Sequence, residues 1–231
     1  MKNISTIIVS ICLFFVSCEA PKTVKIVKTQ QLMVLVYDIS MSNDSYALLN
    51  KSDLSSVYSY IGANGGGKLY GLHILSNSTK QEPFVTNIRS LDTLELKGNK
   101  IQLGKIKKRN DKLNQAFEIG RAQFIQTAAT ALIKTKSEKF SDIENAMLLA
   151  KQIVEMPQYA NWERSILLVS DMLNDFPPKN GLDSMKPLKL SEKVKFGVVR
   201  ASPKVELPNL IPGVTITNYS TIEDGVKAIL N

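Results

Sequence analysis

The chain has 231 residues, of which 44% are hydrophobic, and its formal net charge is +8. This length suffices for one α/β domain, and two cysteines are too few for a small scaffold held by disulfides. The positive charge favours acidic partners or anionic lipid headgroups. We expect no nucleic-acid partner, because the chain begins with an export signal and its lysines are scattered except in Lys105–Lys112, which we interpret as a solvated loop or helix start.

Residues 1–17 are predicted to be a signal peptide. The apolar run Ile4–Val16 is too short to span a bilayer, which takes about 20 residues, and Ser17 and Cys18 follow it. The stretch FVSC resembles a bacterial lipobox, whose cysteine becomes the lipid-bearing N-terminus. More than one acyl chain holds a protein stably on a membrane. An ordinary signal peptide with a chance cysteine is the alternative interpretation.

A lipidated Cys18 predicts a protein of the cell envelope, anchored to a membrane through a tether of residues 18–30. The periplasmic face is preferred to the cell surface, because no run of acidic residues follows Cys18. The other cysteine, Cys12, lies in the segment that would be removed, so the mature chain forms no disulfide. Loss of Lys2 with that segment changes the net charge from +8 to +7.

Five apolar segments have the length and the β-branched content of buried strands. They are residues 31–37, 68–75, 165–170, 194–200 and 213–219. Because they are apolar on both faces, they predict a mostly parallel sheet that helices cover on each side. Residues 83–96 fit this pattern less well and are interpreted as an edge strand and a loop.

Helical periodicity lies between these strands, in residues 53–62, 109–136, 142–156 and 221–230. The sequence S-D-I-E at Ser141–Glu144 has the spacing of a capping box, which predicts Ser141 as the N-cap residue. Alternating strands and helices predict one doubly wound, Rossmann-like α/β domain over residues 31–231.

Two of the predicted strands end in aspartate, at Asp38 and Asp171. In an open parallel sheet the ligand site lies at the carboxyl ends of the strands, and the helix that begins near Ser141 should open on the same edge. Ser40 and Ser42 follow Asp38, and oxygen atoms of this kind suit Mg²⁺. The alternative is turn chemistry, since Asp and Ser are common after strands.

With this arrangement the chain resembles the von Willebrand factor A-like (vWA) family, whose metal-ion-dependent adhesion site is built from three separated pieces. The matching residues are Asp38, Ser40 and Ser42 in a D-x-S-x-S motif, Ser141 five positions before Ala146, and Asp171. Ser141 stands where the family has threonine, and Met172 stands where the family often has glycine. The resemblance covers residues 31–231.

The resemblance implies a divalent cation, Mg²⁺ or Mn²⁺, with Ser40, Ser42 and Ser141 as direct ligands. Asp38 and Asp171 would act mostly through metal-bound water. It also implies one open coordination position, which a carboxylate from a partner protein or peptide would fill. The chain would then be a binding module and not an enzyme.

Two other functions remain open. A metal-dependent hydrolase of phosphate esters or acyl groups could use Asp38 and Asp171, with Asp44 and Asp175 nearby. A scaffold of the same fold could instead bind anionic partners without a metal. The polar, lysine-rich stretch after Asp171 is the predicted determinant of partner selectivity.

Two further signals are given no function. Residues 62–69 have P-loop spacing but lack the Ser or Thr after the lysine and precede a strand, so we predict a helix-to-strand turn. His73 is the only histidine and is predicted to be a satisfied core residue.

Overall fold

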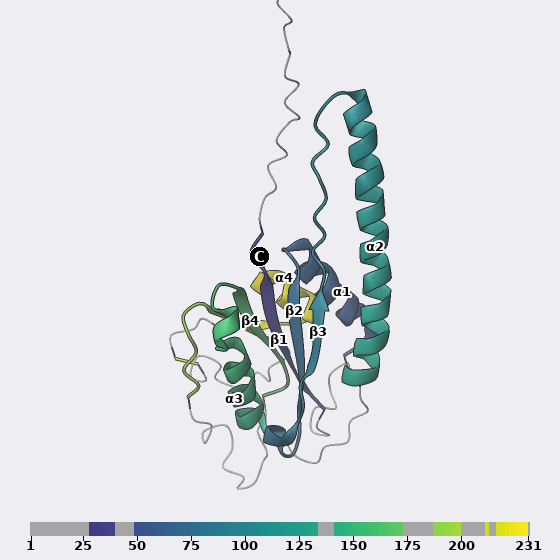
Figure 1. Cartoon of the computed structure of the whole chain (residues 1–231). Coiled ribbons are helices and arrows are strands. Elements are labelled where there is room, and N and C mark those ends of the chain that lie inside the picture. Colours follow the sequence, from purple (N-terminus) through teal and green to yellow (C-terminus); the bar gives the residue numbers. More distant parts are fainter. Residues whose placement is uncertain are drawn as a thin grey trace, which may run out of the picture.

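The structure is a computed structural model that describes residues 28–39, 49–133, 141–172, 187–199, 211–212 and 216–230. Within these residues, six strands form one sheet in the order β3-β2-β1-β4-β5-β6 (Figure 1). The strands are β1 (Gln31–Asp38), β2 (Gly67–Ile74), β3 (Phe84–Ile88), β4 (Glu163–Val169), β5 (Val194–Val199) and β6 (Thr217–Tyr219). Only the pairing of β2 with the edge strand β3 is antiparallel. The predicted fold class, including an edge strand within residues 83–96, is confirmed.

The central strand β1 explains why the strand signal is continuous and not alternating. All eight of its residues are buried. Leu32 and Val34 face one core layer, whereas Met33 and Leu35 face the other. A strand that is covered on both faces needs apolar side chains at successive positions.

Helices cover both faces of the sheet (Figure 1). One core layer contains side chains of α1 (Lys51–Ala63), α2 (Lys100–Leu132) and α4 (Ile222–Leu230), and the other contains side chains of α3 (Ile143–Val154). Two short 3-10 turns, η2 (Ser78–Lys80) and η3 (Pro157–Tyr159), precede β3 and β4. None of the described helices is both long enough and apolar enough to cross a bilayer. The buried residues of both layers lie within residues 32–230, so a chain that starts at Glu19 keeps the whole core.

The helix α2 begins earlier than the sequence predicted. It starts at Lys100 and not at residue 109, and the basic run Lys105–Lys112 is helical throughout. A capping box fixes this start, because Asn99 and Gln102 each accept a hydrogen bond from the other's backbone N–H. The first buried residue of α2 is Phe117, so the half that precedes it projects beyond the domain (Figure 1).

The second half of α2 packs on α1 through an aromatic cluster. The ring of Tyr58 lies 4.9 Å from that of Phe117 and 5.1 Å from that of Phe124. A Cβ atom at Gly120 would lie 2.6 Å from the Tyr58 hydroxyl, so glycine permits this close approach. The cluster holds one end of α2 against the domain.

The glycine-rich segment between α1 and β2 is the helix-to-strand turn that the sequence predicted. Gly65, Gly66 and Gly67 all have positive φ, at 107°, 70° and 150°. At Gly67 a Cβ atom would lie 1.9 Å from the carbonyl oxygen of Gln31. These residues therefore serve the close approach of the turn to the start of β1.

Candidate metal site

Asp38 and Asp171 lie at the carboxyl ends of two adjacent strands. In the parallel pairing of β1 with β4, Tyr37 is opposite Val169. Asp38 is the last residue of β1, and Asp171 comes two residues after the last residue of β4. Their exposed fractions are only 0% and 3%. The sheet therefore brings both carboxylates to the same edge, as predicted.

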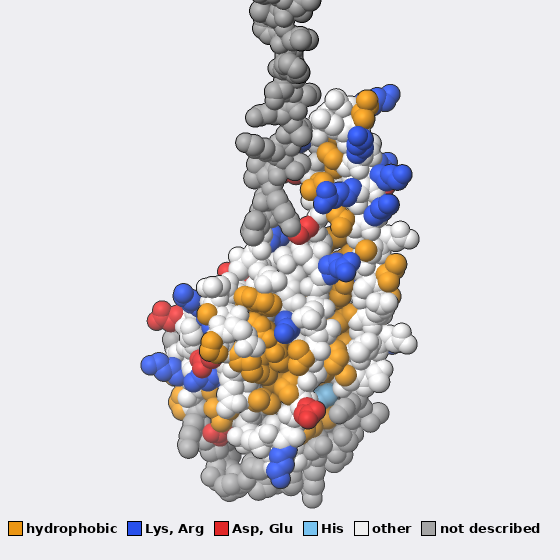
Figure 2. All heavy atoms as spheres, in the orientation of Figure 1, with side chains coloured by type: hydrophobic (Ala, Val, Ile, Leu, Met, Phe, Trp, Pro, Cys, Tyr) orange, Lys and Arg blue, Asp and Glu red, His pale blue; other side chains and the backbone are white. Residues whose placement is uncertain are grey.

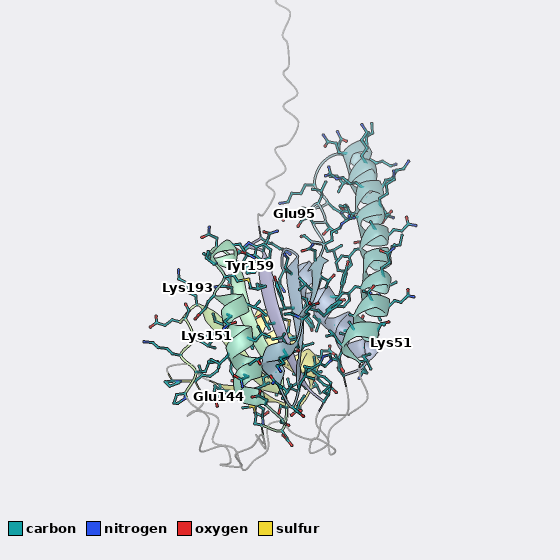
Figure 3. All side chains as sticks on the ribbon, turned by 60° about the horizontal axis from the view of Figure 1, so that its bottom comes forward. Lys51, Glu95, Glu144, Lys151, Tyr159 and Lys193 are labelled. Atoms are coloured by element: carbon teal, nitrogen blue, oxygen red, sulfur yellow. The ribbon has the colours of Figure 1, made fainter. Side chains whose placement is uncertain are left out.

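Ser141 reaches this edge from the α3 side. The backbone N–H of Asp142 donates to the carbonyl oxygen of Leu75, 3.0 Å away. Leu75 follows directly on β2, whose last residue, Ile74, is paired with Asp38. Ser141 is fully buried beside that contact. Figure 3, in which this edge comes forward, shows α3 and α1 on opposite sides of the sheet.

Three of the five predicted site residues thus share one edge of the sheet, although they come from three distant segments. Ser40 and Ser42 lie outside the described residues, as do Asp44, Asp175 and Cys18. Their roles stay predictions. Most of the lysine-rich stretch after Asp171 is likewise outside the described part of the chain.

Ser170 is a site residue that the sequence analysis missed. Its hydroxyl donates to Oδ2 of Asp38 over 2.7 Å and accepts a 2.9 Å hydrogen bond from the backbone N–H of Met172. Hydrogen bonds to a carboxylate are stronger than those between neutral groups. Ser170 therefore fixes the Asp38 carboxylate and joins the ends of β1 and β4. The only signal was a hydroxyl residue at the end of a predicted strand, directly before its aspartate.

Met172 has the backbone conformation that glycine favours. Its φ is 66°, and it is the one non-glycine residue with positive φ in the described part of the chain. Its side chain is only 1% exposed and packs in the core layer beside α3. A left-handed conformation costs a residue with a Cβ about 1–2 kcal/mol. The backbone thus keeps a glycine-type turn, and the buried side chain offsets the strain.

The prediction that Ser141 caps α3 is wrong. The N-cap is Asp142, whose side chain accepts from the backbone N–H of Asn145. The Ser78 hydroxyl donates to the carbonyl oxygen of Asp142, 2.9 Å away, and the Ser78 N–H donates to its Oδ2. Asp is as effective a cap as Ser, and here the helix begins one residue later than the capping box required. Asp142 therefore caps α3, and the predicted ligand Ser141 lies directly before it.

The donor set suits a small divalent cation. The described oxygen donors at this edge are the carboxylates of Asp38 and Asp171 and the hydroxyl of Ser141, all buried. Two carboxylates balance the charge of a divalent ion, and Mg²⁺ binds oxygen ligands in octahedral geometry while keeping several waters. Among the described residues, no group of three or more His, Cys, Asp or Glu side chains is placed to hold a metal.

His73 is a core residue, as the sequence predicted. It is buried, and its Nε2 lies 3.1 Å from the carbonyl oxygen of Leu132. The side chain of Gln81 accepts from the backbone N–H of His73 and donates to its carbonyl oxygen. His73 therefore tethers the end of α2 to β2.

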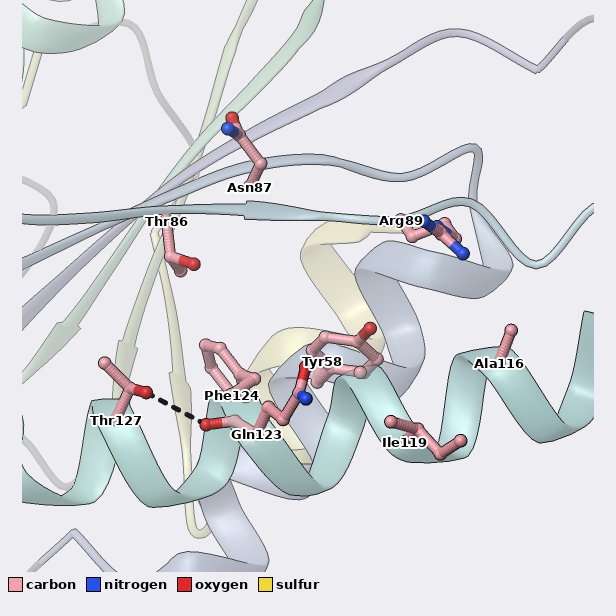
Figure 4. A pocket seen from close by; sticks show the side chains of 10 residues that line it. Tyr58, Thr86, Asn87, Arg89, Ala116, Ile119, Gln123, Phe124 and Thr127 are labelled. Carbon is pink, nitrogen blue, oxygen red and sulfur yellow. Dashed lines mark hydrogen bonds between the residues drawn. The ribbon is translucent and has the colours of Figure 1, made fainter.

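A hollow of about 500 Å³ lies between β3 and α2 (Figure 4). Tyr58, Arg89 and Phe124 are among its lining residues, and none of the predicted site residues belongs to it. Burial raises the pKa of the Tyr58 hydroxyl above its ordinary value. This hollow is separate from the carboxyl edge of the sheet.

No family model matches the chain, and neither does any curated protein. Solved structures do match. A von Willebrand factor type A protein from Catenulispora acidiphila is 9% identical with a TM-score of 0.47, over 87% of this chain and 41% of that one. The manganese-loaded TRAP protein of Plasmodium vivax is 11% identical with a TM-score of 0.43, over 87% and 74%. Mussel proximal thread matrix protein 1 with a zinc-occupied MIDAS motif is 12% identical with a TM-score of 0.41, over 88% and 46%.

These likenesses concern the fold, and the chain spans less than half the length of the first and third of these proteins. The six-stranded sheet itself has the order β3-β2-β1-β4-β5-β6 with an antiparallel β3, and helices flank both faces. The domain is therefore a mostly parallel α/β domain with helices on both faces, which is the fold class that the sequence predicted.

Proposed function

We propose that this chain is a membrane-anchored, vWA-like protein-binding module that binds an acidic group of a partner protein or peptide through a divalent cation. The observation that carries the proposal is the position of Asp38, Ser141 and Asp171. These three oxygen-bearing side chains are buried at one edge of the sheet, although they come from separate segments.

The residues would divide the work by their chemistry. Ser40, Ser42 and Ser141 offer neutral, compact hydroxyl ligands, and Asp38 and Asp171 supply negative charge and orient metal-bound water. Ser170 holds the Asp38 carboxylate in one orientation through its 2.7 Å hydrogen bond. A bound Mg²⁺ or Mn²⁺ would supply an open coordination position that a partner carboxylate completes.

A binding role fits the state of Asp38 better than a hydrolytic role does. Asp38 is 0% exposed, and its Oδ2 already accepts a hydrogen bond from Ser170. A carboxylate held in this way is suited to orienting a metal ligand. A general base would instead need to reach a substrate proton within hydrogen-bond distance.

Calorimetric titration of Mn²⁺ and Mg²⁺ into the chain from Glu19 onward tests the site. We expect saturable binding in the parent and its loss in Asp38→Asn and Asp171→Asn, because each change removes one of the two negative charges. Asp111→Asn is the matched control, since Asp111 is exposed on α2. No binding in a folded parent, or binding that survives both site substitutions, would contradict the proposal.

The open coordination position has its own test. Protein-bound Mn²⁺ enhances the relaxation of water protons through the water molecules that it keeps. A glutamate-containing peptide should lower this enhancement, whereas the same peptide with glutamine should not. Equal effects of the two peptides would show that carboxylate recognition does not occur at the metal.

The proposed anchor is tested in cells. Cys18→Ser should abolish lipid labelling and release the chain from the membrane fraction. Resistance to protease added outside intact cells, with sensitivity after the outer membrane is opened, would support the periplasmic face. Digestion in intact cells would place the protein on the cell surface.

A further inference from the structure

A strongly basic surface lies at the end of the described chain opposite to the candidate metal site. We define the basic tip as residues 95–112, which comprise the turn before α2 and the first part of that helix. It has seven basic residues and two acidic ones, Glu95 and Asp111, and therefore a net charge of +5 out of +8 for the whole chain. The basic residues, all exposed, are Lys97, Lys100, Lys105, Lys107, Lys108, Arg109 and Lys112.

Large apolar side chains are exposed among these charges. Ile101 is 73% exposed and Leu96 is 62% exposed, the two highest values for large hydrophobic residues in the described chain. Figure 2 shows hydrophobic side chains between the Lys and Arg side chains on this part of α2. At helical spacing, Ile101 shares one face with Lys105, Lys108 and Lys112. A face that combines basic and large apolar side chains is typical of peptides that bind in the interface of an anionic membrane.

The tip is held as a rigid projection. Asn110 donates from its side chain to the carbonyl oxygen of Leu94 and accepts from the N–H of the same residue, over 2.8 and 2.9 Å. Leu91 is anchored in turn, because its N–H donates to the carbonyl oxygen of Gly62. The segment before α2 thus runs back along the helix (Figure 1). Residues 100–116 precede the first buried position of α2 and extend about 25 Å at 1.5 Å per residue.

The tip and the start of the domain lie at the same end. Lys28 donates from its side chain to the carbonyl oxygen of Ala63, and the N–H of Leu91 donates to the neighbouring Gly62. Both the entry into β1 and the base of the tip are therefore at the amino ends of the parallel strands. Cys18 precedes Lys28 by ten residues, which span at most about 35 Å. A tether of that reach permits the tip to touch the membrane in which Cys18 would be anchored.

From this arrangement we infer that the basic tip is a docking surface for the anionic headgroups of a lipid bilayer. Lysine and arginine side chains lie in the headgroup layer, and Ile101 and Leu96 enter the boundary with the acyl chains. The sheet then stands with its amino end toward the membrane and its carboxyl edge away from it. This inference rests on charge and exposed apolar area, and it needs neither a metal at Asp38 nor a lipid on Cys18.

Vesicle flotation with the unlipidated chain from Glu19 onward tests the inference. The vesicles contain phosphatidylglycerol and phosphatidylcholine in equal parts, or phosphatidylcholine alone. We expect binding only to the anionic vesicles and a strong loss of binding between 0.1 M and 1 M salt, because the Debye length falls from about 10 Å to about 3 Å. Equal binding to both kinds of vesicle, or no binding to either, would overturn the inference.

Substitutions locate the surface. Lys105→Gln with Lys108→Gln should weaken partitioning about 25-fold, since each basic residue near an anionic surface contributes about fivefold. Lys51→Gln with Lys80→Gln is the matched control, because both lysines are exposed at the carboxyl-edge end and the net charge changes equally. We expect less than a twofold effect from the control. Equal losses from the two pairs would show that net charge, and not the tip, attracts the protein.

A substitution of Ile101 distinguishes binding to a membrane from binding to a soluble acidic partner. Ile101→Ser should reduce vesicle binding at least about fivefold by removing apolar area, and should leave binding to polyaspartate unchanged. If Ile101→Ser has no effect on vesicles while the lysine pair weakens vesicles and polyaspartate alike, the tip is a general anion surface and the inference is wrong. Chelator and Asp38→Asn should leave vesicle binding unchanged, so failure here and failure of the metal site are distinguishable.

Discussion

The left-handed backbone at Met172 predicts an unusual order of stability between glycine and alanine. Met172→Ala and Met172→Gly both remove a buried side chain, and a loss of this kind costs about 2–5 kcal/mol. Alanine keeps the Cβ strain of about 1–2 kcal/mol at positive φ, whereas glycine loses only about 0.5–1 kcal/mol through chain entropy. We therefore expect the glycine variant to be more stable than the alanine variant by about 0.5–1 kcal/mol.

Met147 is the matched control, because it is 4% exposed in the same core layer but lies within α3. There alanine should be more stable than glycine by about 1 kcal/mol. The difference in unfolding free energy between the glycine and the alanine variant should thus have opposite signs at residues 172 and 147. The two differences should lie about 1.5–2 kcal/mol apart. Urea unfolding followed by the fluorescence of Trp162, the single tryptophan, measures all four variants. An alanine variant at residue 172 as stable as the glycine variant would refute the reasoning.

Three further predictions follow from single contacts. Ser170→Ala should lower the free energy of unfolding by about 2–3 kcal/mol, because Asp38 loses a buried hydrogen bond, and it should weaken Mn²⁺ binding. Urea unfolding measures the first effect and calorimetry the second. An unchanged unfolding free energy or an unchanged Mn²⁺ affinity would contradict the role of Ser170. Gly104→Ala should stabilise the projecting half of α2 by about 1 kcal/mol, because alanine favours the helix and the added Cβ meets nothing within 4 Å. Amide hydrogen exchange in this half of α2 should become slower. Faster exchange would count against the prediction. Burial, with the 2.8 Å hydrogen bond to Tyr159, raises the pKa of Tyr70 from 10.0 to about 12. The stability linked to the protonated form of Tyr70 is therefore complete below pH 10 and is lost as the pH rises toward 12. Tyr70→Phe should remove a component near pH 12 from the ultraviolet titration of the tyrosines, and loss of a component near pH 10 instead would argue against the raised pKa.

The sheet could be predicted closely because burial on both faces leaves a continuous apolar signal. The first strand was predicted as residues 31–37 and is observed as Gln31–Asp38. The start of α2 could not be predicted in the same way. Residues 100–108 contact too little of the core to need an apolar stripe, so periodicity was absent there. Their helix depends instead on the local capping box at Asn99 and on residues with high helix propensity.

The site residues at the strand ends could be predicted from the sequence. The site residues that depend on long-range contacts could not. Asp38 and Asp171 were placed together by the rule that ligands bind at the carboxyl edge. The bond from Ser170 to Asp38 joins residues 132 positions apart, and no local pattern signals it. The choice between Ser141 and Asp142 as the cap was equally hidden, because both residue types cap well. The positive φ of Met172 had no signal in the methionine itself.

The two ends of the parallel sheet are chemically different, and this difference separates the proposed functions. The carboxyl edge buries Asp38, Ser141 and Asp171, which suits a cation. The amino end holds the start of β1 and the basic tip, which suits an anionic surface. Because α2 runs from the basic tip to Leu132, beside the carboxyl end of β2, one rigid helix connects the two ends. With the tip on a bilayer, the metal edge faces away from it and stays open to a partner.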